Sequence, residues 1–334
     1  MRNPLNAQQG WAVGSRSYLP AIWGQVIFHT ADGGETWEKQ YEQAPLLDQT
    51  FTYFRLDSVF FLDDQTGWAV GMSEYDQTYH NRWAILYTDN GGLTWQEQGQ
   101  NLHQGLAPEF FDVQFLDTQY GWALDTGHYD SLAEETHFYL AHTLDGGLNW
   151  DWVNTGLPGN LDIGFALVQG GMDFTDVTHG WAAGGLGEVI HTADGGSTWI
   201  TQTLTCDWPV CDKRLFDIDF IDNQVGWIAG EGVYHTTDGG VHWEMSSLAY
   251  KVDFHDVQFL DLNHGWLAGD KGIALYTQNG GVSWQPAINP DTLANLLGMY
   301  ILDPETGWFV GEIGTIFTIT EMPIKTLYLP LVIH

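Results

Sequence analysis

Acidic side chains recur in a short glycine-containing turn, first seen as "HTADGGETW" at residues 29–37. Such a turn could bind calcium or hold a catalytic carboxylate. A calcium loop offers several oxygen ligands at alternating positions, whereas each of these turns offers one carboxylate or amide. Six copies also favour a structural function, so we expect no metal and no cofactor. The acidic or amide residues are Asp32, Asn90, Asp145, Asp194, Asp238 and Asn279, and the tryptophans five positions later are Trp37, Trp95, Trp150, Trp199, Trp243 and Trp284.

Histidines precede several of these turns, and a histidine could act as a metal ligand or a general base. Other copies place tyrosine or phenylalanine at the same position, so the position requires a ring and not a titratable nitrogen. We therefore interpret these histidines as structural. The residues at this position are His29, Tyr87, His142, His191, His235, Tyr276 and Phe317.

A second repeat, a Gly-Trp pair after an alternating strand pattern, divides the chain into seven units. Successive pairs are 39 to 59 residues apart, which suits four short strands. We predict an all-β, seven-bladed β-propeller with Asp-box repeats, four-stranded antiparallel blades and a single domain over residues 1–334. The predicted blades span residues 1–45, 56–101, 110–155, 171–204, 215–248, 254–288 and 297–334.

Each predicted blade has strand A ("DVQFLD"), strand B ("GWAVG"), strand C ("AILYT"), the acidic turn and strand D ("TWQEQ"). The Asp or Asn can accept hydrogen bonds from amides of its own turn, and the two glycines supply positive φ at low cost. We expect the tryptophan to pack beneath the hairpin while its indole N–H donates to a backbone carbonyl.

The acidic turn is similar to the Asp-box, or BNR repeat, of sialidases, xyloglucan hydrolases and sortilin-type receptors. Together, "GWAVG" and "HTADGGETW" resemble the photosystem II stability/assembly factor family along nearly the whole chain. The resemblance implies a seven-bladed propeller acting as an assembly scaffold with a basic, arginine-containing patch. The arginines of this chain lie in distant segments, at Arg2, Arg16, Arg55, Arg82 and Arg214.

The excess of acidic residues excludes some classes of binding partner. With a formal net charge of −33, the chain should repel nucleic acids and anionic membranes. The sequence has no run of about 18 apolar residues, so we expect no membrane insertion. The first residues, "MRNPLNAQQG", lack the apolar stretch of a secretory signal.

Glycoside hydrolysis is the alternative function. Sialidase-like catalysis would require three arginines that converge on the substrate carboxylate, and a tyrosine nucleophile paired with a glutamate. The arginines of this chain lie in distant segments, so we do not expect this arrangement. Xyloglucan hydrolases place two aspartates across a cleft between two propellers, and this chain has the length of one. We predict a non-catalytic protein and assign no catalytic residue.

The first three units differ from the next three in the connection between strands B and C. The Gly-Trp tryptophan precedes the box tryptophan by 26 to 28 residues in the first three units and by 16 to 18 in the next three. The extra residues fall at 15–25, 72–83 and 126–138, and propeller geometry places these loops on one face. We expect them to bind a protein or a glycan; alternatively, they form extended hairpins that bury their own aromatics. The candidate ligand-binding residues are Tyr18, Trp23, Tyr75, Tyr79, Trp83, His128, Tyr129 and Phe138.

Two cysteines, Cys206 and Cys211, lie in one predicted loop, and we expect them to form a disulfide. With the acidic, lysine-poor composition, the disulfide predicts an extracytoplasmic protein. We also expect a monomer. The first unit lacks strand A, which is consistent with the loss of a signal and one strand upstream. Residues in "TLYLPLV" could complete either the last blade or the first.

Overall fold

We describe the protein from a computed structural model. The structure describes residues 7–19, 22–43, 52–53, 55–72, 85–102, 109–125, 128–130, 135–137, 139–155, 170–184, 187–204, 213–287 and 294–319. The chain divides into two compact units, Met1–Asp162 and Ile163–His334. The first unit holds blades one to three and the second holds blades four to seven.

The first unit contains three propeller-type sheets and one small hairpin. Blade one is β1 (Gly10–Leu19), β2 (Ile22–Thr30) and β3 (Glu38–Gln43), with the two-residue β4 (Thr52–Tyr53) paired parallel to β2. Blade two is β5 (Arg55–Phe61), β6 (Gly67–Met72), β7 (Ile85–Thr88) and β8 (Gln96–Gln98), followed by the short helix η1 (Gln100–Leu102). Blade three is β9 (Phe110–Phe115), β10 (Gly121–Asp125), β13 (Tyr139–Thr143) and β14 (Asp151–Asn154), with the separate hairpin β11 (His128–Asp130) and β12 (Glu135–His137).

The second unit contains four sheets in chain order. Blade four is β15 (Gly171–Phe174), β16 (Gly180–Ala183), β17 (Glu188–Thr192) and β18 (Ile200–Thr203). Blade five is β19 (Leu215–Phe220), β20 (Gly226–Gly230), β21 (Gly232–Thr236) and β22 (Glu244–Met245). Blade six is β23 (Phe254–Phe259), β24 (Gly265–Gly269), the short helix η3 (Asp270–Gly272), β25 (Ala274–Thr277) and β26 (Gln285–Pro286). Blade seven is β27 (Leu296–Asp303), β28 (Thr306–Gly311), the short helix η4 (Glu312–Gly314) and β29 (Thr315–Ile319).

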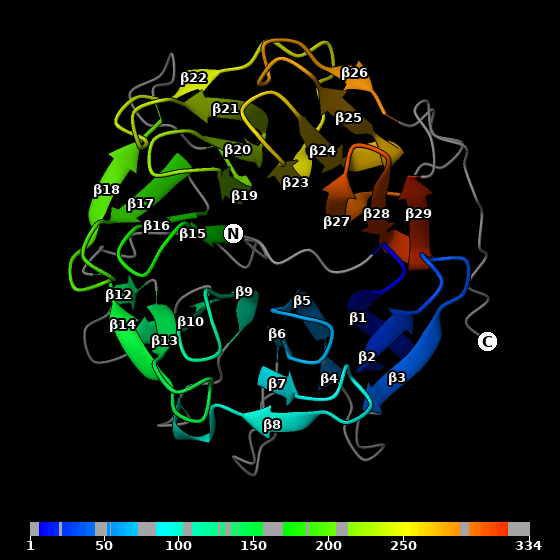
Figure 1. The fold of residues 1–334 in the computed structure, drawn as a ribbon. Coiled ribbons are helices and arrows are strands. Elements are labelled where there is room, and N and C mark those ends of the chain that lie inside the picture. Colours follow the sequence, from blue (N-terminus) through cyan, green and yellow to red (C-terminus); the bar gives the residue numbers. More distant parts are fainter. Residues whose placement is uncertain are drawn as a thin grey trace. The chain divides into compact units, whose positions relative to one another are not determined.

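Successive strands within these blades pair antiparallel, and the first strands of successive blades in the second unit lie next to one another (Figure 1). The sheets confirm the predicted seven-bladed β-propeller. Five blades show the expected four strands. Blade seven shows three in the described residues, and blade one shows three antiparallel strands plus β4. Residues 1–6 and 320–334, which bear on the missing strand and on "TLYLPLV", lie outside the described residues.

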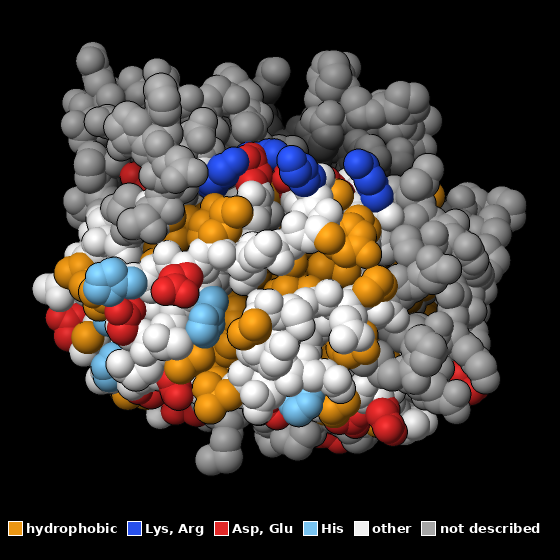
Figure 2. Space-filling view, turned by 90° about the horizontal axis from the view of Figure 1, so that it is seen from above, with side chains coloured by type: hydrophobic (Ala, Val, Ile, Leu, Met, Phe, Trp, Pro, Cys, Tyr) orange, Lys and Arg blue, Asp and Glu red, His pale blue; other side chains and the backbone are white. Residues whose placement is uncertain are grey.

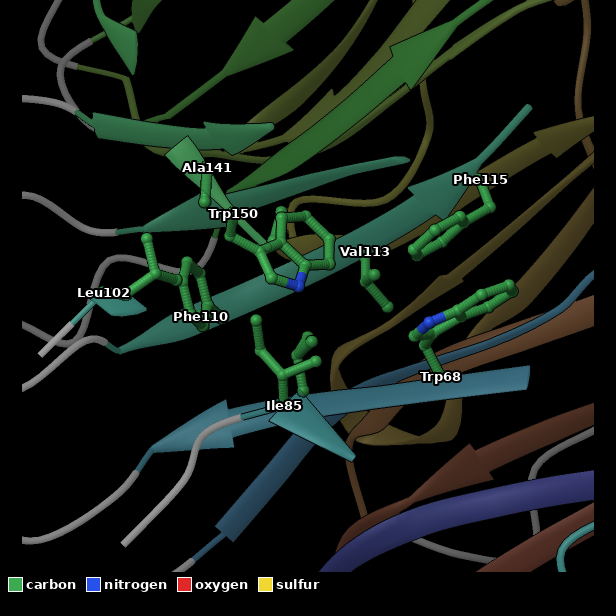
Figure 3. Close-up of a cluster of buried hydrophobic side chains, with 10 residues drawn as sticks. Trp68, Ile85, Leu102, Phe110, Val113, Phe115, Ala141 and Trp150 are labelled. Carbon is green, nitrogen blue, oxygen red and sulfur yellow. The ribbon is translucent and has the colours of Figure 1, made fainter. Parts of the chain in front are cut away.

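Aromatic stacking between neighbouring blades forms the cores. The Gly-Trp tryptophan of one blade stacks on a phenylalanine of the next: Trp68 lies 3.4 Å from Phe115 between ring centroids, and Trp227 lies 3.4 Å from Phe259. Figure 3 shows the first pair within a buried cluster of blades two and three. Ring stacking of this kind adds to the burial of large apolar surfaces.

The glycine of each Gly-Trp pair has a steric reason. A Cβ added to Gly226 would lie 2.6 Å from the ring of Phe220, its cross-strand partner. Glycine therefore lets the phenylalanine lie flat over the strand. The glycine ending β20 has a similar reason, since the carbonyl of Arg214 approaches Gly230.

Candidate functional site

The acidic turns use their oxygen atoms in local hydrogen bonds. In the first copy, the backbone N–H of Thr36 donates to Asp32 Oδ1 at 2.9 Å, and the hydroxyl of Thr36 donates to Asp32 Oδ2 at 2.5 Å. Thr30 donates its hydroxyl to Asp32 Oδ1 and accepts the N–H of Gly34. Both turn glycines have positive φ. The carboxylate is therefore occupied within its own turn.

These bonds favour the charged form of the carboxylates. The hydroxyl of Thr36, followed by its backbone N–H, lowers the pKa of Asp32 to about 2. Equivalent bonds from Thr198 lower the pKa of Asp194. Such groups are already ionised at neutral pH, which does not suit a general acid.

The box tryptophans correct one expectation from the sequence. Each of five lies edge-on to a phenylalanine of its own blade, as Trp150 does to Phe115 at 5.8 Å. Among the described residues, however, the buried indole nitrogens of Trp37, Trp95, Trp150 and Trp284 have no hydrogen-bond acceptor. The expected acceptor is therefore wrong for these four residues.

Two Gly-Trp tryptophans, Trp181 and Trp227, make a backbone bond instead, and they do so across blades. Among the described residues, the buried indole nitrogens of Trp68 and Trp266 have no acceptor. Trp181 donates its indole N–H to the carbonyl of Gly239, in the acidic turn of the next blade, at 3.1 Å. Trp227 donates in the same way to Gly280 at 3.2 Å. At Trp181 and Trp227, a turn carbonyl of the next blade comes within reach of the indole N–H.

The repeated histidines stack on the Gly-Trp tryptophans of their own blades. The ring centroids are 4.0 Å apart for His142 and Trp122, and 4.5 Å apart for His191 and Trp181. Burial lowers the pKa values of His142 and His191. The neutral rings act as flat packing surfaces.

Carboxylates on the inner strands of the second unit join neighbouring blades. Asp173 accepts the backbone N–H of Phe220 at 2.7 Å, and Asp219 accepts that of Phe259 at 2.6 Å. Asp256 accepts the N–H of Met299. The sequence did not predict that these carboxylates bridge blades. Within the described part of the chain, no group of three or more His, Cys, Asp or Glu side chains could hold a metal ion.

The extended loops of the first three blades contain more strand than predicted. Residues 15–19 and 22–25 continue the β1–β2 hairpin, with Ser17 paired to Trp23. The backbone therefore forms the extended hairpin that was the alternative to a loop over 15–25. In blade three, His128 and Tyr129 lie in the β11–β12 hairpin, paired to His137 and Thr136. The backbone continues as hairpins because antiparallel neighbours satisfy its hydrogen bonds.

The structure does not bring the predicted binding residues together as a described site. The backbones of Tyr18, Trp23, His128 and Tyr129 lie in the hairpins just described. Tyr75, Tyr79, Trp83 and Phe138 lie outside the described residues, as do Cys206 and Cys211.

A polar surface that the sequence did not predict lies on blades five to seven, at the blade edge opposite the acidic turns. We call it the short-turn rim. It combines the residues before strand A with the tight turns between strands B and C. The short-turn rim consists of Lys213, Arg214, Glu231, Asp253, Asp270, Lys271, Asn295, Glu312 and Ile313.

Arg214 joins blade five to blade six in this rim. Its Nε donates to Glu231 at 2.7 Å, and one of its terminal nitrogens donates to Asp253 at 2.7 Å. Lys213 lies 3.5 Å from Glu231. Partial burial opposes ionisation, but the hydrogen bond from Arg214 lowers the pKa of Glu231. Figure 2 shows Lys and Arg side chains beside carboxylates along one edge of the visible surface.

Asn295 joins blade six to blade seven. Its side-chain oxygen accepts the backbone N–H of Lys271 at 3.0 Å, and its own carbonyl accepts the N–H of Glu312 at 2.9 Å. The two tight turns are therefore held through one residue. Arg55 in blade two has the same repeat position as Arg214, since their carbonyls approach Gly71 and Gly230. The Arg-Leu pairs at the start of strand A in blades two and five, Arg55-Leu56 and Arg214-Leu215, were the available sequence signal.

Two residues in these turns have left-handed backbone conformations without being glycine. Lys271 and Ile313 both have φ of 58°, and Ile313 is 90% exposed. This conformation costs about 1–2 kcal/mol for a residue with a Cβ, and it is a genuine outlier for a β-branched side chain. The ammonium group of Lys271 makes no ion pair within the described ranges.

Known proteins match both the sequence and the fold. A family described as "Photosynthesis system II assembly factor YCF48" matches residues 158–253. The photosystem II assembly lipoprotein Ycf48 of Synechococcus sp. (strain CC9902) is 34% identical over 122 residues, covering 35% of this chain and 36% of that protein. The chloroplastic photosystem II stability/assembly factor HCF136 of Arabidopsis thaliana is 22% identical over 332 residues, covering 94% of this chain and 73% of the relative.

Solved structures support the propeller fold. A structure described as "YCF48 bound to D1 peptide" matches with a TM-score of 0.65 and 20% identity over 95% of this chain and 91% of that chain. An ancestral GH74 enzyme matches with a TM-score of 0.57 and 13% identity over 80% of this chain and 36% of that chain. The enzyme shares the fold alone at this identity.

No helix among the described residues is long and apolar enough to cross a membrane. The repeats and the seven sheets both indicate a seven-bladed propeller, and the sequence relatives are photosystem II assembly factors. The chain is a seven-bladed Asp-box propeller that is similar, over part of its sequence, to the photosystem II stability/assembly factors.

Proposed function

We propose that this protein is a non-catalytic scaffold that binds a segment of a polypeptide partner at the blade edge opposite the acidic turns. One observation carries the proposal: the repeated acidic and histidine side chains are engaged within the fold, whereas the short-turn rim keeps exposed Lys271 and Ile313 on held turns. Strained residues held by their surroundings often mark functional surfaces. The D1 peptide bound by the YCF48 relative supports a peptide as the ligand.

In the first unit, we propose a second binding surface formed by the connections between strands B and C that the sequence predicts for blades one to three. They contain Tyr18, Trp23, Tyr75, Tyr79, Trp83, His128, Tyr129 and Phe138. Aromatic side chains are frequent anchors at protein interfaces. We favour a polypeptide over a glycan because the sequence relatives are assembly factors. We also propose an extracytoplasmic location, supported by the Synechococcus relative being a lipoprotein.

The test measures peptide binding to the purified chain. Overlapping synthetic peptides of the D1 protein and a displayed library of random peptides serve as probes. The proposal expects saturable binding by at least one set. It also expects that shortening residues 72–83, or replacing Tyr75 and Trp83 by alanine, weakens binding about tenfold or more while the melting temperature changes little.

A matched control is Leu93→Ser. Leu93 is an exposed apolar residue in an acidic turn, at the other blade edge, and its replacement should leave binding unchanged. Failure of both peptide sets to bind would show that the proposed function is wrong. Loss of folding in the shortened variant would show that its aromatics belong to the core, and the proposed binding surface would then be limited to the short-turn rim.

A further inference from the structure

The tight turns of blades six and seven share one unusual geometry. Each begins after an extended glycine, Gly269 or Gly311, and continues through an acidic residue to a non-glycine residue with φ of 58°. The ψ values, 29° for Lys271 and 30° for Ile313, also agree. The two blades therefore place a side chain in the same strained position.

Glycine would avoid the strain at both positions, and the chain uses it nearby. Both turns continue with a left-handed glycine, Gly272 or Gly314. The left-handed region excludes most side chains, and β-branched ones most strongly. An isoleucine at this position therefore costs stability relative to glycine.

The fold does not compensate for this cost through burial of the side chain. Ile313 is 90% exposed, and Lys271 is also exposed without an ion pair among the described residues. The carboxylates beside them are engaged: Asp270 lies 2.9 Å from His255, and Glu312 accepts a hydrogen bond from Asn295 at 3.4 Å. What the two turns leave unused is one ammonium group and one aliphatic side chain.

The two turns are held in fixed positions. Asn295 accepts the N–H of Lys271 through its side chain and the N–H of Glu312 through its carbonyl. Asp270 donates its N–H to the backbone carbonyl of Asp253. The side-chain carboxylate of Asp253 in turn accepts a hydrogen bond from Arg214. Rigid presentation lowers the entropy lost on binding.

We infer that Lys271 and Ile313 form the specificity-determining pair of the short-turn rim, and that they recognise a polypeptide segment carrying a carboxylate next to an apolar side chain. The inference rests on the proposed function. Lys271 supplies the charge partner, and Ile313 supplies an apolar contact. At physiological ionic strength the field of the more distant carboxylates is screened within about 8 Å. The nearest carboxylates, Asp270 and Glu312, face His255 and Asn295.

The experiment combines stability with peptide selection. Random peptides selected on the wild-type chain are tested against Ile313→Gly, Lys271→Gly and Lys271→Asn. Both glycine variants should raise the melting temperature by about 1–3 °C, because the strain is relieved. Each of the three variants should weaken binding of the selected peptides about tenfold, and the selected peptides should be enriched in acidic residues beside apolar ones.

The control variant is Val282→Ser, which removes an 81% exposed apolar side chain from the acidic turn of blade six. It should leave peptide binding unchanged. If peptides bind the glycine variants as tightly as the wild type, this inference is wrong while the proposed function stands. If no peptide is selected on the wild type, both are wrong. A lower melting temperature for Ile313→Gly would also overturn the inference, because its strain argument would be incorrect.

Discussion

At the scale of single residues, the two tryptophans of each repeat have different functions. The Gly-Trp tryptophan stacks between blades and can donate to a turn carbonyl of the next blade, as Trp181 does to Gly239. The box tryptophan packs edge-on inside its own blade, as Trp199 does against Phe174. The acidic residue of the box, Asp194, bonds only within its turn. Replacing the box tryptophan and replacing the acidic residue should therefore lower the stability of the protein by different amounts.

We expect Trp199→Ala to destabilise the protein more than Asp194→Ala. Removing a large packed ring costs about 3–5 kcal/mol, whereas the carboxylate lies in an exposed turn where water can replace its bonds. Urea unfolding followed by circular dichroism measures both. Equal losses would contradict the packing function of the box tryptophan.

The acidic turns should also make stability depend on pH. The pKa values of Asp32, Asp194 and Asp238 are lowered, because the charged forms accept hydrogen bonds. A lowered folded-state pKa adds stability that is present above the unfolded value of 3.8 and is lost as the pH falls toward the folded value, about 2 for Asp32.

Replacing these three residues by asparagine should therefore flatten the loss of stability between about pH 4 and pH 2. Asparagine already serves in two turns, where the N–H of Thr94 donates to Asn90 and that of Ser283 donates to Asn279. Urea unfolding at several pH values is the measurement. Glu35→Gln, Asp89→Asn and Glu305→Gln form a control with the same change in charge, and an equal flattening there would show that the turns are not responsible.

At the scale of elements, neighbouring blades are joined by side chains that reach backbone groups. Gln40, at the centre of β3, donates to the carbonyl of Gly91 in the next blade at 3.0 Å, and Gln202 in β18 donates to Gly239 at 2.9 Å. Gly239 also accepts the indole of Trp181. Each glutamine lies three positions after the box tryptophan. The outer strand of one blade thus holds the acidic turn of the next.

Gln202→Ala should lower the free energy of unfolding by about 1–3 kcal/mol, because the bond between the buried amide and the Gly239 carbonyl is lost together with side-chain packing. A urea titration measures the change. Gln96→Ala, on the exposed edge of β8, is a matched control expected to have little effect. A cost for Gln202→Ala no larger than the control would show that the bond between blades four and five contributes little.

At the scale of the whole molecule, charge is the dominant property. A formal net charge of −33 makes self-repulsion large in the folded state. The fold places some of these carboxylates close together. Asp217 and Asp219 lie on one strand, and they accept the backbone N–H groups of Val257 and Phe259. Compaction of the chain therefore acts against the charge, and salt should assist it.

We expect the melting temperature to rise when the ionic strength increases from about 10 mM to about 150 mM, because the Debye length falls from about 30 Å to about 8 Å. Differential scanning calorimetry in sodium chloride is suitable, with sodium perchlorate as a second salt to separate screening from specific anion effects. A melting temperature that falls with both salts would mean that ion pairs such as Arg214 with Asp253 outweigh the net repulsion.

The cysteines give the last prediction at this scale. If Cys206 and Cys211 form the disulfide that their spacing predicts, thiol labelling of the native exported protein should find no free thiol until the chain is unfolded and reduced. Two thiols that react in the folded protein would contradict both the disulfide and the argument for an extracytoplasmic location.

The sequence by itself determined the features that depend on neighbours along the chain. The number of blades follows from the Gly-Trp repeats, and the acidic turn follows from Thr30, Asp32 and two glycines that bond within seven residues. Local spacing dictates these structures because their hydrogen bonds join residues two to four positions apart. The need for a ring at the His142 position could also be inferred from the repeats, since tyrosine and phenylalanine replace histidine there.

Only the tertiary structure decided what residues far apart in the sequence do together. It assigned the indole bond to Trp181, whose N–H reaches the carbonyl of Gly239 in the next blade, 58 positions along the chain. It joined Arg214 to Asp253 and Lys271 to Asn295, pairs separated by 39 and 24 positions. The left-handed φ of Ile313 was equally hidden, because sequence patterns predict glycine wherever φ is positive. The short-turn rim therefore depends on how the blades pack, and repeats alone could not have revealed it.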